Sequence, residues 1–392
     1  MNNFIFENKT KVYFGKGGVK EYLGSLLGNY GETVMLAYGG GSIKRNGAYD
    51  DVTAALREAG NEVVELSGVT PNPRLDKVLE GVNLVREHGV SLILAVGGGS
   101  VIDSAKAIAM GAATGRDPWE FASTGTRPDK TLPVATVLTL AASGSETSNS
   151  CVLTNEETKE KRGITSETNR PVISFLNPEN TFTVSKFQTG CGIVDIMMHT
   201  LERYLTPEGG ESDLTDRIAE GLLIAVRDAG RRAIADPRDY EARATLMWAG
   251  SVSHNDYTGC GRKRLFPVHK LEHELSAFRD EIAHGAGLSV LFPAWAEHEM
   301  PYDYPRFAQF ANRVLGGEMD FEHPERTARE GIRTLRRFFE EIGMPTHLSQ
   351  LGIKPENYEK LAANTVRTVN GPVKSYSPLD EKAIIEIYRL AE

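Results

Sequence analysis

The sequence predicts an α/β domain with a Rossmann-like parallel sheet, followed by an all-α domain. From about Thr33 to Val137, short apolar runs alternate with longer amphipathic stretches. This alternation is typical of βαβ units, because two parallel strands need a crossover connection between them. Beyond about residue 185, strand-like runs become rare and apolar residues recur at helical spacing, so we expect helices there.

Each expected element has its own run of residues. The first half shows strand-like runs at 34–37, 63–66 and 92–96, and helix-like stretches at 44–59, 74–88 and 101–114. In the second half, helical spacing is clear at 222–226 and 332–339. The turn-rich sequence Asn177-Pro178-Glu179-Asn180 lies just before the rhythm changes. We therefore expect one domain over 1–182 and a second over 183–392.

Length, charge and cysteine usage narrow the class of protein. A chain of 392 residues is long enough for two domains with proper cores. Its net charge of −9 argues against nucleic-acid binding, which needs clustered basic residues, and favours small-molecule partners. The three cysteines lack CxxC spacing, which fits a reducing cytoplasm. No stretch approaches the roughly 20 apolar residues of a membrane span, so we expect no membrane association.

Two glycine runs stand where strands hand over to helices. Gly97-Gly98-Gly99-Ser100 follows an apolar strand directly and opens an amphipathic helix. Glycine there lets a phosphate approach the free N–H groups at the helix N-terminus. Gly39-Gly40-Gly41-Ser42 follows an earlier strand in the same way. Either run alone is also explained by a tight βα turn, and neither matches GxGxxG, but together they favour a dinucleotide site.

Carboxylate and imidazole side chains recur at helical spacing in the second half. Asp195 and His199 are four residues apart, which places them on one face of a helix about one turn from each other. His269 and His273 repeat this spacing. His284 follows, and the glycines beside it indicate a crowded helix start. The four-residue spacing within each pair is the arrangement that two ligands of one metal ion need.

The residue types indicate which metals suit such a site. A carboxylate with several imidazoles favours a divalent transition ion such as Fe²⁺, Zn²⁺ or Mn²⁺. Any single histidine is more often a hydrogen-bonded core or surface residue, and His254 and His298, which lack the helical spacing, are expected to be of that kind. The paired spacings favour a metal centre for the others.

Taken in order, these motifs resemble the iron-containing alcohol dehydrogenase family, in the branch of butanol dehydrogenases and NADPH-dependent aldehyde reductases. The resemblance covers nearly the whole chain, from Phe14-Gly15-Lys16-Gly17 through the two glycine runs and the segments 139–146, 195–204, 273–277 and 284–285. It implies a dinucleotide-binding domain over 1–182, a helical metal-binding domain over 183–392, and a cleft where metal and nicotinamide face each other. It also implies a homodimer.

The resemblance assigns roles by position. The metal ligands would be Asp195, His199, His269 and His284, and His273 would be the unligated histidine near the substrate. The cofactor contacts would be Gly39, Gly40, Ser42, Asn72, Gly98, Gly99, Ser100, Asp103, Thr139, Leu140, Ser143 and Lys161. Strictly NAD-linked members carry an aspartate after the first strand, where this chain has Gly40-Gly41-Ser42, and Lys161 matches a phosphate-contacting lysine. The resemblance therefore favours NADP(H) over NAD(H), with Fe²⁺ as the expected metal and Zn²⁺ or Mn²⁺ as alternatives.

The chain departs from the family pattern at three places. One extra residue lies between His269 and His284, so either the loop absorbs it or the ligand geometry shifts. Leu265-Phe266-Pro267-Val268 replaces a tryptophan-bearing segment, and Ser148 stands where the family has asparagine. These differences affect the expected substrate more than the reaction class.

The expected reaction is hydride transfer between a primary alcohol or aldehyde and NAD(P)(H), with the metal as Lewis acid and His273 as proton relay. The family shares its architecture with dehydroquinate synthase, so a metal- and NAD-dependent lyase is the alternative. That lyase would need basic residues for a phosphate or phosphonate, and Arg262-Lys263-Arg264 is the candidate cluster. A noncatalytic or metal-hydrolase role would require the glycine runs to be purely structural.

Overall fold

Six parallel strands form one sheet in the first half of the protein. In the computed structural model, which describes residues 1–207 and 212–392, the strand order is β1-β8-β5-β4-β2-β3. The strands are β1 Lys11–Phe14, β2 Thr33–Tyr38, β3 Glu62–Leu66, β4 Leu92–Gly97, β5 Val134–Leu138 and β8 Ile173–Leu176. All of their pairings are parallel. The predicted parallel α/β architecture is confirmed.

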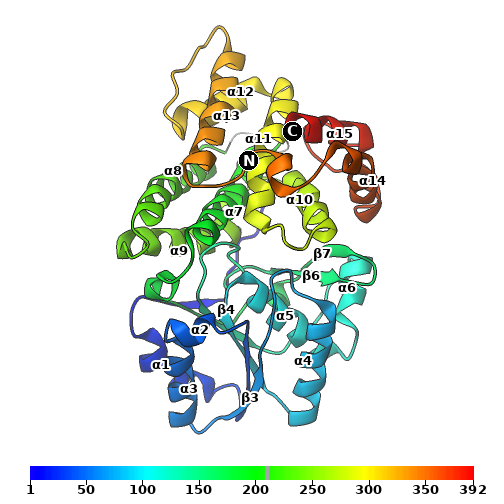
Figure 1. Cartoon of the computed structure of the whole chain (residues 1–392). Coiled ribbons are helices and arrows are strands. Elements are labelled where there is room, and N and C mark those ends of the chain that lie inside the picture. Colours follow the sequence, from blue (N-terminus) through cyan, green and yellow to red (C-terminus); the bar gives the residue numbers. More distant parts are fainter. Residues whose placement is uncertain (208–211) are drawn as a thin grey trace. The chain divides into compact units, whose positions relative to one another are not determined.

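Helices cover both faces of this sheet (Figure 1). They are α1 Gly18–Leu27, α2 Ser42–Arg45, α3 Ala48–Glu58, α4 Leu75–His88 and α5 Gly99–Thr114, while α6 Pro118–Thr124 packs against α5 and residues 150–165. Successive strand side chains point to opposite faces, so each central strand contributes to two cores. Val34 and Leu36 pack with Leu23 of α1 and Val52 of α3. The uninterrupted apolar runs of β2 and β4 reflect burial on both faces.

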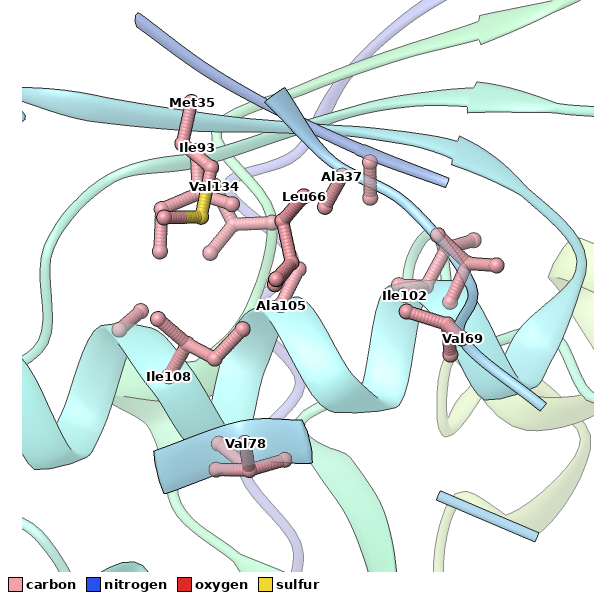
Figure 2. Close-up of a cluster of buried hydrophobic side chains, with 14 of the residues drawn as sticks. Met35, Ala37, Leu66, Val69, Val78, Ile93, Ile102, Ala105, Ile108 and Val134 are labelled. Atoms are coloured by element: carbon pink, nitrogen blue, oxygen red, sulfur yellow. The ribbon is translucent and has the colours of Figure 1, made fainter. Parts of the chain in front are cut away.

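Figure 2 shows the core on the other face of the sheet. Met35, Ile93 and Val134 come from three neighbouring strands and meet Ile102, Ala105 and Ile108 of α5, with Val78 of α4 beyond them. Every residue of α5 from Val101 to Gly111 is buried. Helix α5 starts within the glycine run 97–99, so the burial of α5 fixes that run at the carboxyl end of β4.

An antiparallel hairpin, not anticipated from the sequence, follows β5. Its strands are β6 Ser150–Asn155 and β7 Glu160–Thr165. The backbone N–H of Thr154 donates to the carbonyl of Pro73 at 2.7 Å, so the hairpin is tied to the loop after β3.

The remaining helices run from residue 186 to the C-terminus. They are α7 Lys186–Tyr204, α8 Asp213–Ala235, α9 Tyr240–His254, α10 Pro267–Phe278, α11 His284–Glu299, α12 Tyr304–Arg313, α13 Pro324–Glu341, α14 Tyr358–Thr368 and α15 Glu381–Leu390. This helical second half was expected. No helix within the described residues is both long and apolar enough to cross a membrane.

The chain divides into two structural units by its internal contacts. The sheet unit comprises Glu7–Val184 and Pro237–Asn255, and the helical unit comprises Met1–Phe6, Ser185–Asp236 and Asp256–Glu392. Helix α9 belongs to the sheet unit, where Met247 joins the core with α4 and α5. In the helical unit, α7 is buried almost throughout and packs against α8 and α11.

Candidate active site

Helix α7 carries the first two residues of the predicted metal centre. Ser185 caps the helix, because its hydroxyl oxygen accepts the backbone N–H of Gln188 at 3.2 Å. Asp195 and His199 follow within the buried part of α7. Their spacing brings His199 Nδ1 to 3.7 Å from Asp195 Oδ1.

Helix α10 adds the third residue. Phe266 adopts a left-handed conformation with φ of 52°, and Pro267 then starts the helix at its first position, where the missing N–H is not needed. This turn directs His269 so that its Nε2 lies 3.6 Å from Asp195 Oδ1. The Phe266 ring stands edge-on to the rings of His269 and His199. Phe266 thus packs directly against two of the predicted ligands.

Helix α11 begins with the fourth residue, His284, whose Nε2 lies 3.7 Å from Asp195 Oδ1. The next residue explains how α11 comes so close to α7. A Cβ atom added to Gly285 would lie 2.2 Å from the carbonyl oxygen of Cys191, so only glycine fits there. The link between α10 and α11 is long enough for His284 to point at Asp195.

The four side chains fit a divalent metal ion. Three imidazole nitrogens lie 3.6–3.7 Å from one carboxylate oxygen, and atoms bound at 2.0–2.2 Å to one tetrahedral ion would be about 3.4 Å apart. Among the described residues, Asp195 Oδ1 and His269 Nε2 are buried and have no hydrogen-bond partner. Leaving a buried polar atom unsatisfied costs about 1–3 kcal/mol, and a bound cation would remove that cost.

Two further carboxylates, which sequence reasoning missed, lie against these histidines. Glu202 contacts Nδ1 of His269, and Glu272 contacts Nδ1 of His284. Burial by itself lowers the pKa of His269, but the charge of Glu202 and the carboxylate of Asp195 outweigh it and raise that pKa to about 9. The sequence contains a signal for them: Glu202 and Glu272 come three residues after His199 and His269, so each glutamate lies on the same helix face as a predicted ligand.

Of the three other histidines considered from the sequence, one lies beside the predicted metal ligands and two do not. His273 lies one turn after His269 on α10, and its ring centroid is 5.6 Å from that of His284. It is half-buried, whereas Asp195, His199 and His269 are buried. His254 shares a hydrogen bond with Ser150 at 2.9 Å, and His298 contacts Glu299 and Glu386. These last two are hydrogen-bonded residues, as expected from their lack of helical spacing.

Most of the predicted coenzyme residues lie in the loops and first helical turns that follow the carboxyl ends of the parallel strands. Gly39, Gly40 and Ser42 follow β2, Gly98 to Ser100 follow β4, and Thr139, Leu140 and Ser143 follow β5. Ligands of open α/β sheets bind at this edge. Cβ atoms added at Gly98 and Gly99 would meet Leu140 and Ser143 at 3.1 Å and 2.3 Å, so these glycines let the two loops approach. At Gly40 nothing lies within 4 Å, which leaves open space.

Asp103, predicted as a coenzyme residue, supports the neighbouring loop. Its carboxylate accepts the hydroxyl of Ser145 at 2.5 Å and the backbone N–H of Val152 at 2.8 Å. Lys106, one turn further along α5, is fully buried and was missed. Its ammonium donates to the carbonyl oxygens of Ser145, Ser148 and Ser150 at 2.6–3.0 Å. Asp103 and Lys106 together hold the segment 145–152 to α5.

Lys161 and Asn72 also meet within the sheet unit. Lys161 Nζ donates to Asn72 Oδ1 at 2.9 Å, which joins the hairpin to the loop after β3. Asn72 has φ of 55°, a conformation that asparagine tolerates better than most residues. The hydrogen bond between Lys161 and Asn72 thus fixes the positions of these two predicted coenzyme residues relative to each other.

The basic run 262–264 does not form a phosphate site. Arg262 donates to Asp216 at 2.5 Å and Arg264 donates to Asp256 at 2.5 Å. With both guanidinium groups paired to carboxylates, the run lacks the convergent cations that the lyase would need.

Comparison with known proteins identifies the family. Residues 9–178 match the family Iron-containing alcohol dehydrogenase, and residues 189–391 match Fe-containing alcohol dehydrogenase family, C-terminal. The chain is 41% identical to NADH-dependent butanol dehydrogenase A of Clostridium acetobutylicum over 99% of both chains. It is 36% identical to the NADPH-dependent aldehyde reductase YqhD of Escherichia coli over 90% of both.

Solved structures give the same result. The crystal structure of NADH-dependent butanol dehydrogenase A from Thermotoga maritima superposes with a TM-score of 0.95 at 38% identity, covering 100% of this chain and 99% of the other. The E. coli YqhD structure superposes with a TM-score of 0.93 at 32% identity over 100% and 99%. The chain therefore belongs to the iron-containing alcohol dehydrogenase family and is an NAD(P)-dependent oxidoreductase that interconverts alcohols and aldehydes.

Proposed function

We propose that this enzyme reduces short aliphatic aldehydes, and oxidises the matching primary alcohols, at a divalent metal held by Asp195, His199, His269 and His284. The observation that carries the proposal is the convergence of three imidazole nitrogens on Asp195 Oδ1 at 3.6–3.7 Å. Butanol appears in the name of the relative at 41% identity, which supports a four-carbon substrate. Fe²⁺ is the proposed ion, with Zn²⁺ and Mn²⁺ as competitors for the same ligands.

When bound, the metal supplies Lewis acidity at the substrate oxygen and the nicotinamide supplies or accepts the hydride. The reduction consumes one aldehyde, one NAD(P)H and one proton, and yields one alcohol and one NAD(P)⁺. This chain's residues supply the proton and the surroundings. Asp195 and His269 are buried, and the Phe266 ring stands edge-on to His269, so bulk water is kept away from these two side chains.

His273 is the proposed proton relay. It stands beside His284 and is half-buried, so its imidazole has access to solvent, unlike that of His269. An imidazole that exchanges protons with water delivers one to the alcohol oxygen during reduction and removes it during oxidation.

The coenzyme proposed is NADP(H), in preference to NAD(H). A carboxylate beside the ribose repels a 2′-phosphate, and the loop after β2 has glycines and Ser42 where that carboxylate would stand. Lys161 provides a cation at the same edge of the sheet. The relatives divide on this point, because those at 38–41% identity are named NADH-dependent and YqhD is named NADPH-dependent. The sequence resemblance further leads us to propose a cytoplasmic homodimer.

One experiment tests the main proposal. Metal-free protein is reconstituted separately with Fe²⁺, Zn²⁺ and Mn²⁺, and each form is assayed with NADPH and NADH against aldehydes of two to eight carbons. The proposal expects activity only with metal, highest with Fe²⁺, and a higher kcat/KM with NADPH. Full activity in the metal-free protein would overturn the metal role, and equal or higher kcat/KM with NADH would overturn the coenzyme preference.

A further inference from the structure

Two fully buried carboxylates connect the three helices that carry the proposed metal ligands. Glu202 on α7 contacts Nδ1 of His269 on α10, and Glu272 on α10 contacts Nδ1 of His284 on α11. Both glutamate side chains have no exposed surface. Each contact therefore joins one helix to the next, and each engages the ring nitrogen opposite the one that points at Asp195.

Glu202 has a second contact that fixes it in place. Its Oε1 accepts the backbone N–H of Val268 at 2.6 Å, directly before His269. Val268 is the second residue of α10, so this N–H has no partner within its own helix. The carboxylate thus holds both the start of the helix and the imidazole of His269.

The side chain of Glu272 packs against α11 at a glycine of that helix. A Cβ atom added to Gly287 would lie 2.6 Å from Cγ of Glu272, so glycine at this position admits the carboxylate. Burying a carboxylate is costly unless it is paired and hydrogen-bonded. The chain nevertheless places two of them here, each on a histidine of the centre.

A carboxylate on Nδ1 determines what Nε2 can do. In the neutral imidazole, an Nδ1–H that donates to a carboxylate leaves Nε2 as the nitrogen without a proton, and its lone pair is then free for a cation. The negative charge also makes that lone pair a better donor and fixes the ring plane. His269 Nε2 and His284 Nε2 are the atoms 3.6 Å and 3.7 Å from Asp195 Oδ1.

We infer that Glu202 and Glu272 are positioning residues that orient His269 and His284 and set the affinity of the centre for its divalent cation. This inference rests on the proposed metal site. It assigns neither glutamate to direct contact with the ion or the substrate. Removing either carboxylate charge is expected to weaken metal binding about 10- to 100-fold.

The test measures metal binding by the purified full chain without any assay of activity. Metal-free wild type, Glu202→Gln and Glu272→Gln are titrated with Zn²⁺ against a chromogenic chelator, and the Co²⁺ forms are compared by visible absorption. We expect a 10- to 100-fold higher Kd in each variant and displaced Co²⁺ bands. Binding of NADPH, followed by its fluorescence, is expected to stay unchanged.

Glu299→Gln is the matched control. Glu299 is a fully buried carboxylate of the same helical unit and accepts a hydrogen bond from a histidine, His298, at 2.8 Å. It is not one of the residues around Asp195. We expect Glu299→Gln to bind Zn²⁺ as the wild type does, even if it unfolds at a lower temperature. If one glutamine variant fails to fold, the other still decides the question.

The outcomes separate this inference from the proposed function. Wild-type affinity in both glutamine variants, with binding lost in His269→Ala, would overturn the positioning role and leave the metal site standing. Equal losses in the variants and in Glu299→Gln would also overturn it, because the effect would then be general destabilisation. A loss of a thousandfold or more in Glu272→Gln would mean direct ligation. Wild type that binds no metal would overturn the proposed function itself.

Discussion

Asp195 Oδ1 and His269 Nε2 are 3.6 Å apart on two different helices, and both atoms are buried without a hydrogen-bond partner among the described residues. Helix α7 supplies the carboxylate and α10 the imidazole, and His199 and His284 point at the same oxygen. A fold with this arrangement and no cation leaves polar atoms unsatisfied in its core, so the pair is a sensitive reporter of metal binding.

His269→Ala is predicted to abolish stoichiometric metal binding and to lower kcat/KM at least a thousandfold. The substitution removes one of four proposed ligands and leaves Asp195 without its nearest imidazole on α10. Metal content after desalting measures the first effect, and NADPH fluorescence is expected to show unchanged coenzyme binding. His298→Ala is the control, since His298 lies on Glu299 and Glu386. Retained metal with wild-type turnover in His269→Ala would refute the assignment.

His273→Gln is predicted to lower kcat about 10- to 100-fold while metal content stays at the wild-type level. The glutamine keeps polar character beside His284 but cannot relay a proton near neutral pH. The pH profile of kcat is expected to lose the limb that reports the relay. Loss of metal in this variant would instead place His273 among the ligands.

Gly40→Ala is predicted to weaken coenzyme binding several-fold without changing thermal stability. A Cβ atom at Gly40 meets no protein atom within 4 Å, so the added methyl group enters only space that the coenzyme would occupy. Gly28→Ala, at another open position in the same unit, serves as the control for the substitution itself. An unchanged Kd for NADPH and NADH in Gly40→Ala would exclude this loop from the coenzyme site.

Lys161→Ala is predicted to raise the KM for NADPH about tenfold or more and to leave the KM for NADH within a factor of about three. The lysine charge is expected to interact with a 2′-phosphate, which NADH lacks. Lys161 also donates to Asn72, so a purely structural role would impair both coenzymes equally. Steady-state kinetics with each coenzyme distinguishes the two results.

Asp216→Asn is predicted to lower the free energy of unfolding by about 3 kcal/mol at pH 7. Burial alone would raise the pKa of Asp216, but hydrogen bonds from Arg306 and Arg262 prevail and lower it. A carboxyl group with a lowered pKa stabilises the folded protein at pH values above its ordinary pKa near 3.8. That stabilisation disappears as the pH falls through the folded-state pKa.

Denaturant unfolding at several pH values checks this prediction. The difference between wild type and Asp216→Asn is expected to shrink below about pH 4, where the unfolded carboxyl is protonated. Asp228→Asn is the control, because Asp228 is half exposed in its pairs with Arg227 and Arg231 and contributes less than about 1 kcal/mol. A pH-independent loss in Asp216→Asn would refute the electrostatic explanation.

The sequence alone carried the local information. Continuous apolar runs at 34–37 and 92–96 predicted strands of a parallel sheet, and the structure confirms β2 and β4 there. The four-residue spacing of Asp195 and His199 predicted two side chains on one helix face, which is a property of the helix itself. The strands β6 and β7 were not predicted, because apolar and polar residues do not alternate in their sequences.

Only the tertiary structure could bring α7, α10 and α11 to one point, because no periodicity relates positions on separate helices. It revealed that Gly285 admits α11 against α7, that Glu202 and Glu272 lie behind the histidines, and that Lys106 is buried in α5. In the sequence these last three are ordinary charged helix residues. The sequence determined the residue types of the centre and the class of fold, while long-range packing decided which side chains meet and which carboxylates support them.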